Sequence, residues 1–394
     1  MAKLGDICTK ITDGSHNPPQ GISHSEYLML SSKNIYDNEI TLDDPRYLSA
    51  ENYAIENKRT QISTGDILLT IVGTVGRAAV VSDSIKNICL QRSVAVIKPK
   101  SNLIDSRFLM YQLQSMRTHL EQEARGVAQK GIYLKQVENL QVKVPSMDEQ
   151  LRVVKKLDKV SELIALRKEQ LAKLDQLVKS RFIELFGDPV DNPKNYLVKS
   201  LQELIDMGYI TYHLDGNHGG DYPRSEEFVD SGVPYIGANS IVNGKIDFSM
   251  AKFLTAERAG KLRKGIAQND DVLFAHNATV GPTVVLKTTE PKVILSTSLT
   301  AYRCNQSVLL PNYLKAYMQS DGFVRQYSGE MKQTTRNQVP ITAQKKYLFL
   351  VPPFVEQEQF AAFVKQTDKS KLAIQQSLDK LELLKESLMQ EYFG

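Results

Sequence analysis

Two short stretches of the chain carry residues whose types and spacing could do chemistry. Residues 13–21 read DGSHNPPQG. An Asn-Pro-Pro followed by an aromatic residue is the signature of enzymes that methylate amino groups on DNA bases, but here Gln20 follows the prolines. The related stretch DGNH at 215–218 continues with Gly, Gly and Asp. The two stretches share only Asp-Gly-x-His, so a methyltransferase motif is not indicated.

Other familiar catalytic signatures do not occur in the sequence. VGTVGR at 72–77 lacks the Lys-Ser/Thr of a phosphate-binding loop, and its counterpart NATVGP at 277–282 keeps one glycine, which favours a turn between strands. Each Asp-Gly-x-His offers one His and one Asp without further ligands. A turn in which Asp bonds the backbone and Gly takes a positive φ is more typical than a metal site. We therefore expect no catalytic residues and no metal site.

Loops in both halves carry side chains suited to bases and phosphates. Arg and Lys contact guanine edges or phosphates, while Asn and Gln can pair with adenine. The candidate DNA-binding residues of the first half are Ser15, His16, Lys33, Asn34, Lys58, Arg59, Arg77, Arg92, Arg125, Gln129 and Lys130. Those of the second half are His218, Asn239, His276, Asn277, Lys332, Gln333, Thr335, Arg336 and Asn337. One such cluster is typical of any solvated surface, but clusters in matching loops of both halves favour DNA binding.

The loops match because the chain contains a tandem repeat. Thr-Val-Gly at 74–76 returns at 279–281, 205 residues later (281 − 76). Three further pairs follow in the same order at nearly the same spacing: RYLSAE at 46–51 with KFLTAE at 252–257, VPSMDEQ at 144–150 with VPPFVEQ at 351–357, and ELFG at 184–187 with EYFG at 391–394. Four ordered matches indicate a duplication.

Each repeat is predicted to be an α+β globule followed by a long helix. Short β-like runs such as DILLTIV and SLTAYRC are separated by Gly, Asn, Asp and Pro turns. One helix-like stretch interrupts them in each half, at 106–124 and at 311–327. The predicted domains are recognition domains at 1–147 and 196–354, helices at 148–187 and 355–394, and a linker at 188–195.

Apolar residues recur at heptad spacing in both helices. Residues 148–186 contain no Gly or Pro, and Gly187 is a typical helix terminator. The predicted seam comprises Val153, Leu157, Val160, Ile164, Leu171, Leu174 and Val178, with Arg167 completing the series, and Phe360, Val364, Ile374, Leu378 and Leu381. A helix of about 37 residues spans roughly 55 Å.

Connectivity predicts that the two helices are antiparallel. The first helix delivers the chain to the second globule, so the second helix can pack along the first only by running back. We expect two globules held apart by an antiparallel helical pair. The alternative is that each amphipathic helix packs on its own globule.

The bulk composition fits a soluble globular protein of more than one domain. Of 394 residues, 42% are hydrophobic and 24% are charged. Cys8, Cys89 and Cys304 are odd in number and far apart, which indicates neither a disulfide framework nor a metal-spaced pair. No signal peptide and no run of membrane-spanning length is present, so we expect a cytoplasmic protein with no membrane partner. With a net charge of +4, a nucleic-acid surface must come from local clustering.

Taken together, these features give the whole chain a resemblance to the DNA-specificity subunit of type I restriction–modification systems. The stretches that carry it are TDGSHNPP, TGDILLTIVGTVGR, KGIYLKQVENLQVKVPSMDEQ and ITAQKKYLFLVPPFVEQ, with the paired helices. The second copy departs from the first at DGNHGGDYP and has only a loose equivalent of GIYLKQVENL. That difference implies two unlike half-sites.

The resemblance implies that each recognition domain reads one half of a bipartite double-stranded DNA site. The helices would form an antiparallel spacer that also binds two adenine-methylating modification subunits, and restriction subunits would join to give an endonuclease. This chain would be non-catalytic and would bind no cofactor, because S-adenosylmethionine would bind to the modification subunit. The target adenine would still have to leave the base stack to reach that enzyme.

Two hypotheses from other classes remain. A self-sufficient nucleic-acid-modifying enzyme would bind S-adenosylmethionine as an isolated chain. A coiled-coil scaffold unrelated to DNA would lack the salt-dependent DNA binding that phosphate contacts produce.

Overall fold

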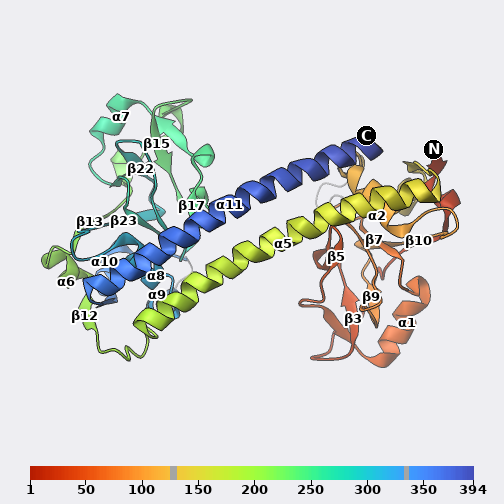
Figure 1. The fold of residues 1–394 in the computed structure, drawn as a ribbon, viewed down its shortest axis with the longest axis horizontal. Helices are drawn as coiled ribbons and strands as arrows, with labels where there is room; N and C mark the ends of the chain where they lie inside the picture. Colours follow the sequence, from red (N-terminus) through yellow and green to blue (C-terminus); the bar gives the residue numbers. More distant parts are fainter. Residues whose placement is uncertain (125–130, 332–336) are drawn as a thin grey trace. The chain divides into compact units, whose positions relative to one another are not determined.

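The computed structural model describes residues 1–124, 131–331 and 337–394. The chain forms two compact units, Met1–Lys168 with Gln376–Gly394, and Glu169–Gln375 (Figure 1). Each unit contains the globule of one repeat together with part of each long helix. The boundary between the units therefore cuts through both helices, whereas we expected each helix to be a separate segment.

Two sheets form the centre of the first unit. A four-stranded antiparallel sheet has the order β2 (Cys8–Asp13), β10 (Val94–Pro99), β7 (Ile67–Thr70), β8 (Ala78–Val80). A three-stranded sheet has the order β6 (Arg46–Leu48), β3 (Tyr27–Leu30), β9 (Ile88–Leu90), in which β3 and β9 are parallel. Leu69 faces the core shared with the helices, whereas Leu68 faces the core shared with the second sheet. Both faces of β7 are therefore covered, which explains its uninterrupted apolar sequence.

Helices and short strands complete the first unit. The Ser49 hydroxyl accepts a hydrogen bond from the Asn52 backbone N–H at 3.2 Å and so caps α1 (Ala50–Thr60). The Asp105 carboxylate caps α2 (Ser106–Ser115) in the same way. The remaining elements are α3 (Arg117–Glu123), α4 (Leu134–Glu138), the pair β1 (Ala2–Lys3) and β11 (Gln141–Val142), and the pair β4 (Ile35–Tyr36) and β5 (Glu39–Ile40).

The second unit repeats this plan. Its four-stranded sheet has the order β13 (Ile210–Asp215), β23 (Leu299–Cys304), β20 (Val272–Ala275), β21 (Thr283–Val285). Its second sheet has the order β14 (Phe228–Val229), β18 (Lys252–Leu254), β15 (Val233–Ile236), β22 (Val293–Leu295), β19 (Ile266–Ala267). β15 and β22 are parallel, like β3 and β9. Two short pairs are β12 (Leu197–Ser200) with β24 (Leu348–Val351) and β16 (Ile241–Val242) with β17 (Lys245–Ile246).

The helices of the second unit differ from the sequence prediction in the same way as those of the first. They are α6 (Leu201–Asp206), α7 (Ala256–Lys261), α8 (Pro311–Met318), α9 (Asp321–Met331) and α10 (Ile341–Gln344). The stretch at 106–124 forms two helices, α2 and α3, because the helix is interrupted at Met116. The stretch at 311–327 likewise falls on α8 and α9, which are separated by residues 319–320. Helices α1, α4, α6, α7 and α10 were not predicted, although Ser49 and Thr255 are typical N-caps of α1 and α7.

The two long helices are α5 (Met147–Phe186) and α11 (Phe354–Phe393). In the first unit, Val153 and Leu157 of α5 lie in one cluster with Leu388 and Tyr392 of α11, and Arg167 donates to the Ser377 hydroxyl at 3.3 Å. In the second unit, Lys371 pairs with Asp175 at 2.6 Å, and the Phe360 ring lies 5.6 Å from that of Phe182. Within each unit the helices therefore run in opposite directions, as predicted.

The predicted apolar seam residues are all buried or partly buried. Val153, Leu157, Val160, Phe360 and Leu378 are buried, and Ile164, Leu171, Leu174, Val178, Val364, Ile374 and Leu381 are partly buried. The prediction missed Phe182 and Phe186, which are also buried. Gly187 ends α5 with φ +77°, its N–H bonding the Ile183 carbonyl at 2.8 Å.

A buried glutamine explains the repeated P-x-x-x-E-Q. The Gln150 amide accepts from the Asp105 backbone N–H at 2.8 Å and donates to the carbonyls of Leu103 at 3.1 Å and Pro145 at 2.9 Å. Gln357 makes the matching bonds, to Leu310, Val308 and Pro352 at 2.9–3.2 Å. Both side chains are 0% exposed, so each ties the start of a long helix to its globule.

Truncating Phe360 tests the packing of the helices in the second unit. Phe360→Ala removes a 0%-exposed ring that packs on Phe182 and Phe186, so we expect a loss of about 3–5 kcal/mol in the free energy of unfolding. Leu372→Ala on the same helix, where the side chain is 53% exposed, should change it by less than about 0.5 kcal/mol. Urea unfolding followed by circular dichroism measures both. Equal effects would show that Phe360 does not hold the pair together.

Candidate nucleic-acid interface

In the first unit, four loops meet where β2, β3, β7 and β9 end. The Ser15 N–H donates to the Leu90 carbonyl at 2.7 Å, which joins the loop at 13–16 to the loop at 91–93. The Ser93 hydroxyl accepts from the Ser32 N–H at 3.1 Å, and its carbonyl accepts from the Ile71 N–H at 2.9 Å. Ser93 therefore ties together the loops that follow β3 and β7. We call these four loops the first loop cluster.

The second unit has the same cluster at the ends of β13, β15, β20 and β22. The Ser298 hydroxyl accepts from the Ala238 N–H at 2.8 Å, and its carbonyl accepts from the His276 N–H at 3.0 Å. Ser298 thus repeats the role of Ser93. The sequence carried a signal for this pair, since both serines follow the repeat spacing (298 − 93 = 205), but we had not selected them.

Each loop cluster also receives the chain that leads toward the long helix. The Ile132 N–H donates to the Ile71 carbonyl at 2.9 Å, and Gly131 is bridged to Val72. In the second unit the Val339 N–H donates to the His276 carbonyl at 2.8 Å, and Gln338 is bridged to Asn277. The candidate residues Arg125, Gln129, Lys130, Lys332, Gln333, Thr335 and Arg336 lie outside the described residues.

The two Asp-Gly-x-His stretches each present an oriented imidazole. His16 Nε2 lies 2.7 Å from the Asp13 carboxylate, and His218 Nε2 lies 2.7 Å from that of Asp215. The carboxylate accepts from Nε2–H, which leaves Nδ1 of each exposed ring for another partner. Such a ring can contact a base edge or a phosphate.

The reason for the glycine differs from our prediction. Neither Gly14 nor Gly216 has a positive φ. Instead, a Cβ on Gly14 would lie 2.1 Å from the Leu90 carbonyl oxygen, and one on Gly216 would lie 2.3 Å from the Ser296 carbonyl carbon. The glycines allow two loops to touch, and Asp bonds the histidine ring rather than the backbone.

The described basic candidates of the first unit are either engaged by other side chains or exposed without an ion pair to a described residue. Arg59 and Lys33 are engaged: Arg59 pairs with the Asp13 carboxylate and Lys33 with that of Asp44 at 2.5 Å. Arg77 lies over the Tyr36 ring, 5.0 Å from its centroid, which orients the guanidinium beside the loop at 71–77. Lys58 and Arg92 are exposed and form no ion pair with any described residue, so they are the better candidates for phosphate contacts.

Two candidate residues are buried. Asn34 is 1% exposed, and its amide accepts from the Ser31 N–H at 3.1 Å and donates to the Asp43 carbonyl at 2.8 Å, so it shapes a turn. His276 is 1% exposed, with Nδ1 2.8 Å from the Thr300 hydroxyl. The structure therefore does not place either side chain where it could read DNA directly. Asn239 and Asn337 are exposed and Asn277 is partly buried.

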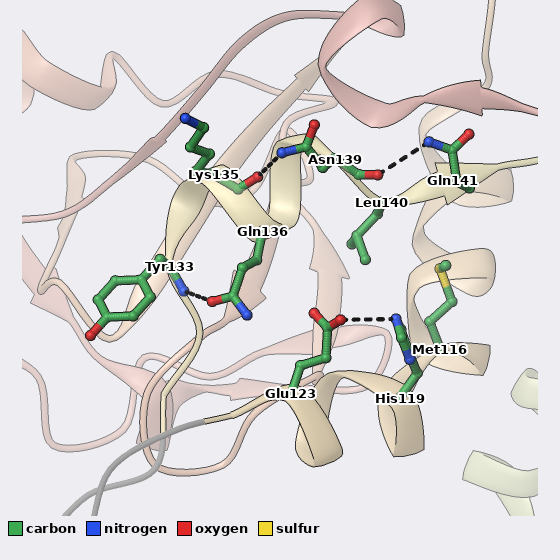
Figure 2. A pocket seen from close by; sticks show the side chains of 9 residues that line it. All are labelled: Met116, His119, Glu123, Tyr133, Lys135, Gln136, Asn139, Leu140 and Gln141. Atoms are coloured by element: carbon green, nitrogen blue, oxygen red, sulfur yellow. Dashed lines mark hydrogen bonds and ion pairs between the residues drawn. The ribbon is translucent and has the colours of Figure 1, made fainter.

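A cavity in the first unit is lined by residues outside its loop cluster. Its volume is about 690 Å³. Figure 2 shows the residues that line it, which come from α3, α4 and the chain just before and after these helices. Met116 and Leu140 supply apolar surface, and His119 Nε2 lies 3.7 Å from the Glu123 carboxylate. None of the candidate DNA-binding residues lines it. Over the described residues, no three His, Cys, Asp or Glu side chains gather as a possible metal site, and no helix is long and apolar enough to cross a membrane.

Comparisons with known proteins agree with the repeat. A sequence model described as the type I restriction modification DNA specificity domain matches residues 1–176 and 193–383. The type I restriction enzyme EcoBI specificity subunit of Escherichia coli is 37% identical over 128 residues, which cover 32% of this chain and 27% of that protein. The MjaVIII specificity subunit of Methanocaldococcus jannaschii is 23% identical over 238 residues, which cover 57% of this chain and 53% of that protein. The matches thus span about a quarter and about half of these relatives.

Solved structures share the fold. The S subunit of a type I restriction–modification system from M. genitalium aligns with a TM-score of 0.57 at 14% identity, covering 100% of this chain and 95% of that chain. A chain from a study of complex assembly and conformational transition of the type I R-M system aligns with a TM-score of 0.53 at 18% identity, covering 100% and 96%. At these identities the likeness establishes the fold alone.

Acid should destabilise the second unit through His213. Burial lowers the pKa of His213 from 6.5 to about 4 and also lowers the pKa of His276. The unfolded chain then takes up protons near pH 6.5 while the folded chain does not, so stability falls as the pH falls from about 6.5 to about 4, by about 3 kcal/mol for His213. His213→Ile, with the residue type of the matching Ile11, should flatten this dependence.

The measurement is urea unfolding at a series of pH values. His24→Gln, at an exposed position of the first unit, is the control and should leave the pH dependence unchanged. An unchanged slope in His213→Ile between pH 6.5 and 4 would show that His213 does not carry the effect.

Proposed function

The chain belongs to the type I restriction–modification DNA specificity family, and we propose that each of its two repeated domains reads one half of a bipartite double-stranded DNA site. The observation that carries this proposal is the loop cluster that occurs twice, at the ends of equivalent strands. Both clusters combine an exposed, carboxylate-oriented histidine with loops tied by one serine. Loops held on a sheet are suited to base contacts because their positions are fixed before binding.

The two half-sites should differ in sequence. The frames of the clusters match, but the exposed candidate side chains of the two units do not: the first unit offers Arg92 and Lys58, whereas the second offers Asn239 and Asn337. Arg and Lys favour guanine edges or phosphates, and Asn favours adenine. An asymmetric site follows from this difference.

We propose that the long helices are a spacer between recognition domains at 1–147 and 196–354, with helices at 148–187 and 355–394 and a linker at 188–195. The buried glutamines support this, because each fixes a globule to the start of a helix. Spacing along DNA and rotation about its axis would then be set together.

The helices also offer a surface for two copies of one partner, proposed to be the adenine-methylating modification subunit. Leu177 is 49% exposed in the second unit, and Leu384 is 46% exposed in the first. These positions lie 207 residues apart (384 − 177), the spacing that separates ELFG from EYFG. A leucine that is left exposed at the equivalent position of both helices suits contact with two identical partners. Restriction subunits would join this core.

Methyl transfer is proposed to belong to the partner, with S-adenosylmethionine bound there and no cofactor on this chain. We expect the purified chain to transfer no methyl group to DNA, and we expect addition of its modification subunit to create adenine methylation at a two-part site. Sequencing that detects methylated adenines measures this. Methyl transfer by the chain alone would favour a self-sufficient enzyme, and salt-independent behaviour toward DNA would favour a scaffold.

Lengthening both helices tests the spacer. Insertion of four residues after Lys168 in α5 and four after Gln375 in α11 keeps the flanking contacts Arg167–Ser377 and Lys371–Asp175 in register. The insertion adds about 6 Å, or nearly two base-pair rises, and about one helical turn. We expect the half-site sequences to stay the same and the gap between them to grow by one or two base pairs.

Methylation mapping of the insertion variant measures the gap. A control variant carries the same four residues in the linker at 188–195, outside the helices, and should leave the gap unchanged. Altered half-site sequences with an unchanged gap would show that the helices do not set the distance.

A further inference from the structure

The second unit contains a connected set of buried polar side chains that reaches its loop cluster. The set comprises His213 on β13, Thr300 and Tyr302 on β23, Gln344 on α10, and His276 directly after β20. Their exposures are 8%, 0%, 0%, 0% and 1%. Buried polar groups are costly unless their hydrogen bonds are made, so the bonds within the set decide its role.

Gln344 is the centre of the set, and its orientation follows from one carbonyl. The Val339 carbonyl can only accept, so the Gln344 amide nitrogen, 3.2 Å away, must donate to it. That nitrogen also donates to the Thr300 hydroxyl at 3.1 Å. The amide oxygen then accepts from the Tyr302 hydroxyl at 2.6 Å and from His213 Nε2 at 3.1 Å. Gln344 therefore makes all four of its hydrogen bonds.

The hydrogen bonds continue from Thr300 to His276. The Thr300 hydroxyl accepts from Gln344, so its own proton can be donated to His276 Nδ1 at 2.8 Å. The Thr300 hydroxyl therefore connects the Gln344 amide to the His276 ring. The His276 backbone is held as well, because its N–H donates to Ser298 at 3.0 Å and its carbonyl accepts from Val339 at 2.8 Å. His276 thus joins the loop that follows β20 to the segment at 337–339.

The first unit builds the same fold without this set. The matching positions are occupied by Ile11, Ile71, Ala95, Ile97 and Val137. The strand pair Ile97–Ile11 corresponds to the pair Tyr302–His213. The hydrogen bond from Ile132 to Ile71 corresponds to that from Val339 to His276. Ile71, Ala95, Ile97 and Val137 lie in the hydrophobic core. The fold therefore does not require polar side chains here, and their presence in one unit points to a local role.

We propose that Gln344, Thr300 and His213 are positioning residues of the second recognition domain, which act through His276 to hold Asn277 and residues 337–339 in the geometry that reads the second half-site. This inference rests on the proposed function. A directional network specifies one arrangement of the ring and the two segments, whereas apolar packing tolerates small shifts. At the matching positions the first domain has apolar packing in place of this network.

The test uses the full chain with its modification subunits. Thr300→Val keeps the side-chain shape but removes the hydroxyl, and Thr300→Ser keeps the hydroxyl. Tyr313→Phe is the control, because it removes one equally buried hydrogen bond of the same unit, from Tyr313 to the Leu350 carbonyl at 2.9 Å, which belongs to a different core element. Methylation mapping first identifies the site. Binding is then measured to the cognate duplex and to duplexes with one base pair changed in either half-site.

Discrimination is the ratio of the affinity for the cognate duplex to that for a duplex with one changed base pair. We expect Thr300→Val to lower this ratio about tenfold at the second half-site, a loss of the size of one base contact, and to leave it unchanged at the first. Thr300→Ser and Tyr313→Phe should keep both within about twofold. Undiminished discrimination in Thr300→Val, equal loss at both half-sites, or the same loss in Tyr313→Phe would each overturn the inference and leave the proposed function intact. An unmodified chain that reads no two-part site would overturn the proposed function and the inference together.

Discussion

The attachment of each long helix to its globule depends on one buried amide. Gln150 and Gln357 are fully enclosed, and each bonds three backbone groups that belong to the helix start and to the loop before α2 or α8. Loss of either amide would leave buried backbone groups without partners, which typically costs about 1–3 kcal/mol for each. Within each unit, the globule that carries the loop cluster is therefore fixed to the start of its long helix. The proposed role of the helices, to set a distance along DNA, would need that rigidity.

Features that depend on periodicity could be predicted from the sequence. Val153, Leu157 and Phe360 were identified from heptad spacing alone, because a helix without Gly or Pro places such residues on one side wherever it packs. The repeat likewise identified equivalent loops. Features that depend on tertiary contacts could not be predicted. Nothing in the neighbouring sequence indicates that Asn34 is buried. Nothing there indicates either that position 14 must be glycine because the Leu90 carbonyl approaches it.

The two repeats share a backbone frame but differ in how they fill it. Asp13 and Asp215 orient a histidine in the same way, and Ser93 and Ser298 tie the same loops. Behind that frame, Ile97 and Val137 pack as hydrocarbons, whereas Tyr302 and Gln344 form hydrogen bonds. A duplicated frame with different interiors and different exposed side chains is what two readers of unlike sequences require, since the frame sets position and the side chains set specificity.

The decisive test of the proposal that each repeat reads its own half-site is a chain in which residues 1–147 are replaced by the second domain, 196–354. Both helices of this chain carry the same loop cluster. Methylated adenines are mapped after this chain is expressed with its modification subunits. We expect a symmetric site, with the second half-site present twice in opposite orientations and the gap unchanged. Methylation at the original asymmetric site would contradict it.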